Sequence, residues 1–287
     1  MRKQFKDTVT ELAARDERIV LVFGDISVFL FKDFQKTHPD RFYNMGICEQ
    51  ALISVAAGLS SQGLVPFAHS IAPFITERAL EQIKLDCSYN KFPVNIVSCG
   101  ATFDYAWDGA THHAWTDLAF LRVIPDVEIF QPGNDQEIDR LLRWHYDDGK
   151  TSYFRLSDHP HSGKFEIERE RGVVVRDCGA SQTVVAAGPI LENVLKAAED
   201  LFINILYFHT LKPFDHGLIR RFAHTRLKVV HDSFGLFEAV CETAGVSVAR
   251  LGLPDRFCCS YGTIEDVRQM AGLDVESIRA FLSRAGA

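Results

Sequence analysis

The sequence predicts an α/β protein with two domains, each built on a mostly parallel sheet that helices cover. Short apolar runs rich in β-branched residues recur along the chain, and amphipathic helical patterns lie between them. Strands that alternate with helices imply right-handed crossovers and parallel pairing. A polar, charged stretch at residues 157–172 interrupts the alternation and is typical of a linker. We therefore predict one domain over residues 1–165 and a second over residues 173–287.

The elements follow one another with short connections. The first half carries predicted strands at residues 19–23, 65–68, 94–98, 127–131 and 153–155, and predicted helices at residues 3–14, 51–62, 76–89, 117–121 and 135–146. The second half carries strands at residues 182–187, 203–208 and 228–231, and helices at residues 190–200, 216–223 and 236–249. Apolar residues at helical spacing indicate the helices, and short β-branched runs indicate the strands.

Composition and charge restrict the function. The 287 residues are 47% hydrophobic, enough for two cores, and 31 basic against 38 acidic residues give a net charge of −7. This balance argues against non-specific binding to nucleic acids or membrane surfaces, which requires a basic face. No apolar run approaches the roughly 20 residues of a membrane span, and the seven cysteines show no C-x-x-C spacing. We expect a reduced, cytoplasmic protein without a metal site of its own.

Polar residues follow several predicted strands, at the edge where ligands of parallel sheets collect. Asp25 lies in FGDIS after the first strand, and Asp108, His112 and His113 lie in DGATHHAWTD. Asp25 could instead cap the turn after its strand, and the two histidines could be surface residues. Neither G-x-G-x-x-G nor G-x-x-x-x-G-K-[ST] occurs, so we do not expect the chain to hold phosphates by itself.

Glu49 occupies an unusual place, the junction between a strand end and an apolar helix in NMGICEQALISVAAGLS. A carboxylate at an apolar junction loses solvation, which disfavours its charged form. Nothing about folding requires a carboxylate there. We therefore expect a polar group to meet it.

A series of segments gives these residues a common interpretation. MRKQFKDTVTELAARDERIVLVFGDIS, RFYNMGICEQALISVAAGLSSQG, FITERALEQIK, DGATHH, VIPDVEIFQPGN, FHTLKPFD and LGLPDRF follow one another along nearly the whole chain. In this order they resemble the C-terminal half of transketolase and its relatives, including deoxyxylulose-phosphate synthase, which use thiamine diphosphate. The resemblance implies a pyrimidine-binding domain followed by the family's C-terminal domain.

The resemblance implies that Glu49 is catalytic, because the glutamate of G-I-x-E contacts N1′ of the cofactor's aminopyrimidine ring in this family. A poorly solvated carboxyl agrees with a proton shared with that nitrogen. The resemblance further implies that Ile47 lies beneath the bent cofactor and that Asp25 lies near its thiazolium ring. It implies that the Phe74 ring stacks on the pyrimidine, with Arg78 nearby. Asp108 and His112 are implied to contact the substrate.

The chain departs from the family's pattern around the substrate. Gly100 stands where a substrate-binding histidine is usual, and Phe29 and Asp158 stand where a serine and an arginine often hold a substrate phosphate. A carboxylate there would repel a phosphate. We therefore expect a non-standard sugar acceptor. The three aromatic residues of TFDYAW (102–107) either line the vacated space or pack on a partner subunit.

The family's metal-binding segment, G-D-G…N, does not occur in the chain. The resemblance therefore implies a separate N-terminal subunit that holds the diphosphate and Mg²⁺, in an α2β2 heterotetramer. The implied reaction is transfer of a two-carbon ketol unit from a ketose to an aldehyde. The open alternatives are a related carboligase, either deoxyxylulose-phosphate synthase-like or similar to the β subunit of 2-oxo-acid dehydrogenases, and a non-catalytic partner subunit.

Overall fold

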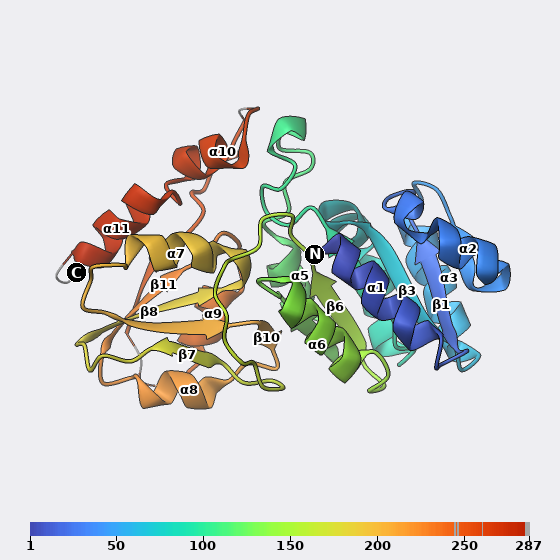
Figure 1. The fold of residues 1–287 in the computed structure, drawn as a ribbon, viewed down its shortest axis with the longest axis horizontal. Coiled ribbons are helices and arrows are strands. Elements are labelled where there is room, and N and C mark those ends of the chain that lie inside the picture. The colour runs from blue at the N-terminus through green and yellow to red at the C-terminus, as the bar shows by residue number, and fades with distance from the viewer. Residues whose placement is uncertain (244, 246, 260, 285–287) are drawn as a thin grey trace.

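The protein contains two sheets that lie side by side, each flanked by helices (Figure 1). The structure, a computed structural model, describes residues 1–243, 245, 247–259 and 261–284. The N-terminal half forms the sheet drawn in blue to green, and the C-terminal half forms the sheet drawn in yellow to orange. The predicted α/β class is confirmed. Within the described residues, no helix combines the length and the apolar character needed to cross a bilayer.

The first sheet has seven strands in the order β10-β5-β6-β4-β3-β1-β2. Their bounds are Ile19–Phe23 (β1), Phe42–Asn44 (β2), Val65–Ile71 (β3), Asn95–Cys99 (β4), Val127–Phe130 (β5), Thr151–Arg155 (β6) and Thr210–Lys212 (β10). The first six pair in parallel, whereas β10 pairs antiparallel with β5. Since β10 comes from the second half of the chain, strand pairing crosses the predicted division at residues 165–173, and the domain bounds remain a prediction.

The helices around the first sheet precede its first strand or lie in the connections between its parallel strands. They are Arg2–Ala13 (α1), Lys32–Thr37 (α2), Glu49–Ser61 (α3), Leu80–Gln82 (α4), Asp117–Arg122 (α5) and Asp135–His145 (α6), with short 3-10 turns at Val28–Phe31 (η1), Pro39–Arg41 (η2) and Ala106–Asp108 (η5). The helix predicted at residues 76–89 is interrupted. It is formed instead by the π-helical segments Phe74–Arg78 (η3) and Ile83–Tyr89 (η4) on either side of α4. Such π-bulges occur frequently at functional sites.

The second sheet has five strands in the order β12-β11-β8-β9-β7. Its elements are Val173–Arg176 (β7), Gln182–Ala187 (β8), Gly188–Ile190 (η6), Leu191–Ala197 (α7), Asn204–Phe208 (β9), His216–Arg221 (α8), Arg226–Val230 (β11), Leu236–Cys241 (α9), Val248–Leu251 (β12), Ile264–Ala271 (α10) and Val275–Ser283 (α11). The edge strand β7 pairs antiparallel with β9, and the other pairs are parallel.

The helix predicted at residues 236–249 is wrong beyond its first turns. It ends at Cys241, Gly245 has a φ of +79°, and Val248 begins strand β12. Residues 244 and 246 of that prediction lie outside the described residues. A glycine in the left-handed region ends helices, and the β-branched Val248 favours the strand that follows.

The two sheets pack against each other through a shared core. One continuous apolar cluster contains buried side chains of both, including Ile129 of β5, Val185 of β8 and Leu206 of β9. Across the same junction, the Tyr207 hydroxyl donates a 2.6 Å hydrogen bond to Oε2 of Glu137 on α6. Burial of this apolar surface fixes the C-terminal half beside the carboxyl ends of the first sheet's strands.

Candidate functional site

Four adjacent strands, β4, β3, β1 and β2, bring most of the candidate residues to one edge of the first sheet. Because these strands are parallel, the segments that follow them meet at this edge. Asp25 follows β1, Glu49 follows β2, Phe74 follows β3, and the loop with Asp108 and His112 follows β4. The topology therefore gathers residues that lie far apart along the chain.

Glu49 lies at this edge, with a side chain that is 1% exposed. Its Oε1 accepts a 3.0 Å hydrogen bond from the Ser70 hydroxyl, and its Oε2 accepts a 2.7 Å bond from Nη1 of Arg78. Glycine at position 24 makes room for this arrangement, since a Cβ there would lie 2.8 Å from Ser70 Oγ. The predicted polar partner is therefore present within the chain itself. With a hydroxyl and a guanidinium group as its neighbours, Glu49 lies in a more polar environment than the sequence suggested.

Phe74, Arg78 and His112 form one packed group beside Glu49. The Arg78 guanidinium carbon lies 4.4 Å from the Phe74 ring centroid, within the range of cation–π contacts. The His112 ring meets the Phe74 ring edge-on, with centroids 5.1 Å apart. The loop after β4 is thus in direct contact with segment η3, and four of the predicted site residues lie together.

Asp25 and Ile47 lie at the rim instead. Asp25 is exposed and has a φ of 59°. Its carboxylate accepts a 2.9 Å hydrogen bond from the side-chain amide nitrogen of Asn44, and its backbone N–H donates a 3.0 Å bond to the side-chain oxygen of Asn44. Ile47 is 69% exposed. Among the described contacts, neither side chain touches Glu49. Asp108 is also exposed, at the end of η5. All three side chains are exposed, so a ligand or another chain can reach them.

His69 was not predicted from the sequence. It is completely buried, and burial lowers its pKa to about 4, so the imidazole is neutral. Nδ1 lies 2.7 Å from the Val97 carbonyl and must donate to it, which leaves Nε2 to accept from the Ser27 hydroxyl at 3.0 Å. Ser27 has a left-handed φ of 59°. His69 therefore holds the strained loop that carries Asp25, and its one signal is a histidine inside the apolar run VPFAHSI.

A second network, centred on the fully buried Arg155, holds the loop after β4. Its Nε donates to Oδ2 of Asp117 at 2.7 Å, and its Nη2 donates to the Thr102 hydroxyl at 3.0 Å and to the Ala114 carbonyl. The Tyr153 hydroxyl donates to the same carboxylate oxygen at 2.6 Å. Removing one member of such a buried charge pair leaves the other uncompensated and costs about 3–5 kcal/mol.

Asp104 joins the same loop to the segment after β6. Its carboxyl group is 2% exposed and accepts hydrogen bonds from the Ser157 hydroxyl at 2.8 Å, the Asp158 amide at 2.9 Å and the Ala101 amide at 3.1 Å. Burial raises the pKa of Asp104 to about 7, although these donors partly oppose the change.

Replacing Asp104 by asparagine is expected to remove a pH dependence of stability. The folded-state pKa of about 7 exceeds the unfolded value of about 3.9. The stabilisation is therefore fully present below the unfolded pKa and is lost as pH rises through 7. Between pH 5 and 8, we expect the wild-type free energy of unfolding to fall by about 2 kcal/mol relative to the variant. Urea unfolding at each pH measures this, and parallel profiles for the two proteins would contradict it.

At Gly100, one of the positions that depart from the family's pattern, a neighbouring aromatic ring takes the place of the missing side chain. Gly100 has a φ of +77°, and a Cβ there would lie 2.5 Å from the Tyr105 ring. Tyr105 therefore occupies the space that a side chain at position 100 would need. Phe103 is fully buried, whereas Trp107 is 60% exposed and meets Tyr105 edge-on. The expectation that three rings line one surface is thus wrong.

Asp158 is paired with a cation. Arg2 at the start of α1 donates to its two carboxylate oxygens at 2.8 and 3.3 Å. The pair is partly exposed, so its net contribution to stability is small. Its charges nevertheless offset each other, and the predicted repulsion of a phosphate by Asp158 is weaker than the sequence suggested. Phe29 is 62% exposed at the same rim.

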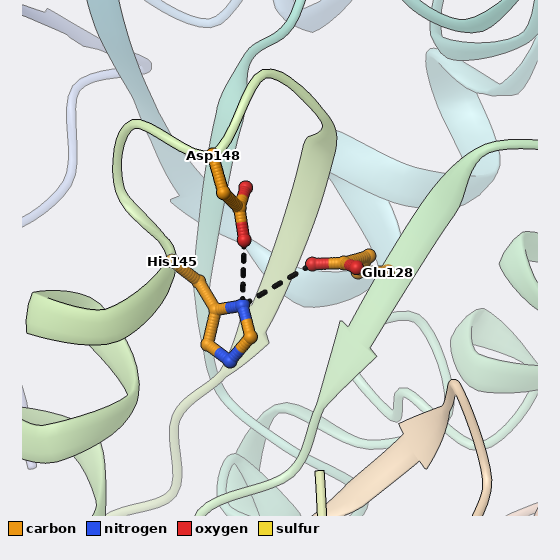
Figure 2. Close-up of side chains that lie close together, drawn as sticks. All are labelled: Glu128, His145 and Asp148. Carbon is orange, nitrogen blue, oxygen red and sulfur yellow. Dashed lines mark hydrogen bonds and ion pairs between the residues drawn. The ribbon is translucent and has the colours of Figure 1, made fainter. Parts of the chain in front are cut away.

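A separate cluster joins β5, α6 and the turn before β6 (Figure 2). Nδ1 of His145 lies 2.8 Å from Oδ2 of Asp148 and 3.3 Å from Oε2 of Glu128. These ligand-type atoms lie close enough together to hold a metal ion. However, Lys150 lies 2.6 Å from Glu128 and Arg169 lies 2.9 Å from Asp148, so cations already compensate both carboxylates. We interpret the cluster as a structural ion-pair network.

The charge state of His145 agrees with this interpretation. Burial alone would lower its pKa, but hydrogen bonds and charges from Asp148 and Glu128 outweigh burial and raise it. Burial likewise opposes ionisation of Glu128, yet its bonds to His145 and Lys150 lower its pKa. Both partners therefore favour their charged forms. The network lies at the amino ends of β5 and β6, away from the edge that carries Glu49.

Comparison with known proteins identifies the family to which this α/β fold, with Glu49 at the carboxyl edge of its first sheet, belongs. The family described as "Transketolase, pyrimidine binding domain" matches residues 1–159. An apulose-4-phosphate transketolase subunit of Phocaeicola vulgatus is 31% identical over 297 residues, covering 96% of this chain and 94% of the relative. The 1-deoxy-D-xylulose-5-phosphate synthase of Thermus thermophilus is also 31% identical, and the chain spans 48% of its length.

A solved structure extends the likeness to the whole chain. It is described as a split gene transketolase in the form of an inactive β4 tetramer, and it is 30% identical to this chain. The two superpose with a TM-score of 0.86 over 99% of each chain. The chain belongs to the transketolase family, whose members depend on thiamine diphosphate, and corresponds to the C-terminal section of its longer members.

Proposed function

We propose that this chain is the C-terminal subunit of a thiamine-diphosphate-dependent transketolase that moves a two-carbon ketol unit from a ketose to an aldehyde. The observation that carries the proposal is Glu49, a buried carboxylate at the ligand edge of the sheet, held by Ser70 and Arg78. Burying a carboxylate in this way is costly. Its place at the ligand edge, beside Phe74 and His112, favours a catalytic over a purely structural role.

The residues around Glu49 have the chemical character that the aminopyrimidine half of the cofactor requires. Phe74 offers a ring for stacking, Ile47 an exposed apolar side chain, and Asp25 an exposed carboxylate on the neighbouring loop. When bound, the cofactor supplies a carbon nucleophile that stabilises the transferred unit. Arg78 is 38% exposed, so it can turn away from Glu49 as the ring nitrogen approaches. Glu49 would then hold or release the proton at N1′.

Asp108 and His112 are proposed to contact the sugar. The Thr111 hydroxyl lies 3.0 Å from Nδ1 of His112, which leaves Nε2 as the nitrogen available to a substrate hydroxyl. The contact between His112 and Phe74 supports a position for this imidazole next to the proposed pyrimidine ring. The Arg155 network fixes the loop, so the two residues would keep their places while substrates exchange.

The proposed partner is a separate N-terminal subunit that holds the diphosphate and most of the Mg²⁺ contacts, giving an α2β2 heterotetramer. A face beside the site suits such a partner. Val55 of α3 and Leu85 and Tyr89 of η4 are 38%, 40% and 79% exposed. The two elements pack together, and the Ser54 hydroxyl on α3 bonds to Asp86 on η4. Exposed apolar residues on two elements that pack together are typical of an interaction surface.

Ribose 5-phosphate is expected to be a poor acceptor for the reconstituted enzyme. Asp158 replaces the arginine that often holds the substrate phosphate in this family. The Tyr105 ring fills the space beside Gly100, where a substrate-binding histidine is usual. Losing one charge-assisted contact costs about 1.5–3 kcal/mol, or roughly one to two powers of ten in kcat/KM. We would measure ketol transfer from β-hydroxypyruvate to D-ribose, ribose 5-phosphate and nucleotide-linked aldehydes.

The same assay separates the proposed reaction from the proposed acceptor. Transfer to any of these aldehydes, dependent on both subunits and on thiamine diphosphate, supports the reaction, and its absence with every acceptor opposes it. A kcat/KM that is highest for ribose 5-phosphate would show that the interpretation of the phosphate position is wrong. Asp158→Asn is expected to raise activity toward ribose 5-phosphate severalfold and to leave D-ribose unaffected.

A further inference from the structure

A cavity of about 550 Å³ lies between the loop after β4 and the second sheet. Trp115 and Thr116 line one side, while Phe234, Arg250 and residues 253–257 line the other. Its volume falls within the range of small-molecule sites. None of the residues proposed to bind cofactor or substrate lines it. Figure 1 shows this part of the chain at the top, where the segment after β4 rises beside α10.

Arg250, from strand β12, is a charged group in the lining of this cavity that carries an unpaired donor atom. Its guanidinium carbon lies 4.7 Å from the centroid of the Phe234 ring and 5.6 Å from that of the Phe237 ring, so two aromatic rings orient it. Its Nη2 is buried and has no hydrogen-bond partner in the part of the chain that the structure describes. A buried charged donor without an acceptor is costly, and a carboxylate, sulfonate or phosphate would satisfy it.

The remaining walls suit a flat apolar body. The rings of Trp115 and Phe257 lie 5.6 Å apart at an angle of 34°, and Leu253 lies on the same surface. Two arginines, Arg250 and Arg256, line the cavity against one carboxylate, Asp255. Aromatic walls with an excess of positive charge favour an anion carried on a flat ring over a neutral or cationic molecule.

We propose that this cavity binds a small organic anion with a flat apolar body, with its charged group on Arg250 and its ring against Trp115 and Phe257. Hydrogen bonds connect this cavity to the loop that carries the proposed substrate residues. The Trp115 carbonyl accepts hydrogen bonds from the Ser233 hydroxyl at 2.7 Å and from the Phe234 amide at 3.1 Å. A ligand here would therefore contact Trp115, which lies three residues after His112 in the same loop.

The test uses two fluorescent probes of matched shape on the full chain. 8-Anilinonaphthalene-1-sulfonate carries the anion, and N-phenyl-1-naphthylamine lacks it. For Arg250→Met we expect the Kd of the sulfonate to rise about tenfold or more, with little change for the neutral probe. Arg220→Met, an exposed arginine on α8, is the matched control and should leave both affinities unchanged.

Competition on the wild-type chain gives a result that does not depend on any variant folding. Benzoate should displace the sulfonate probe, and benzamide, which has the same ring without the charge, should not. Equal displacement by both compounds, or a sulfonate Kd that is the same in Arg250→Met as in the wild type, would overturn the proposal. Circular dichroism of each variant shows whether it has folded, and Arg250→Lys, which keeps the charge, should retain most of the affinity.

Discussion

Replacing Glu49 by glutamine slows exchange of the C2 proton of bound thiamine diphosphate by about two to four powers of ten, the usual contribution of a positioned acid or base. An amide cannot pass a proton to N1′ of the pyrimidine ring. The fold should persist, because the glutamine oxygen can still accept from Arg78 while its amide donates to the Ser70 hydroxyl. Proton exchange in the reconstituted complex, followed by NMR, measures the effect.

Glu81→Gln is the matched control for this experiment. Glu81 lies on α4, in the connection that also carries Phe74 and Arg78, but is exposed. The control should exchange the C2 proton at the wild-type rate. Thermal unfolding of both variants shows whether the loss of the ion pair with Arg78 has affected the fold. Exchange at the wild-type rate in Glu49→Gln would remove this carboxyl from the mechanism.

The purified chain is expected to bind thiamine diphosphate weakly, with a Kd above about 0.1 mM, and to turn over no substrate until the N-terminal subunit is added. The reason is that the Mg²⁺–diphosphate contacts, which are charge-assisted and contribute about 1.5–3 kcal/mol each, belong to the proposed partner. Calorimetric titration with cofactor and Mg²⁺ measures the affinity. Tight binding by the chain alone would contradict the proposed division between subunits.

Two variants test which face the partner covers. Val55→Arg places a charge on the exposed side of α3 and should abolish reconstitution of activity while leaving the chain folded. Phe202→Arg changes a residue that is 73% exposed on the second half of the chain and should reconstitute normally. Equal activity of the two mixtures would mean that the face formed by α3 and η4 is not the subunit interface.

The strand and helix pattern was predictable because local periodicity reflects burial. The run IVLVF becomes β1, buried along its whole length, and the strands predicted at residues 94–98 and 182–187 agree closely with β4 and β8. The short edge strands β7 and β10 were missed, and most of β12 was assigned to a helix or left unassigned, whereas a strand end was expected just before Glu49, where β2 lies. Three or four residues carry too little pattern, and their pairing depends on the neighbouring strand. The π-helical segments were missed because they share the apolar spacing of an ordinary helix.

Around the site, the sequence indicated the residue types and the structure decided their partners. The place of Glu49 between a strand end and an apolar helix, together with the order of the family's segments, was readable from the chain alone. Its pairing with Arg78, 29 positions away, was not. Likewise, nothing local connects Arg2 with Asp158 or places the Tyr105 ring beside Gly100.

The amino-acid sequence by itself therefore determined the fold class, the family and the carboxylate at the centre of the proposed chemistry. These depend on spacing along the chain and on residue type. Only the tertiary structure decided which charges are compensated, which space is filled and where Arg250 is left without an acceptor among the described residues. The physical reason is that such contacts join segments brought together by parallel crossovers and by burial of a core shared between both halves, and no local pattern encodes that arrangement.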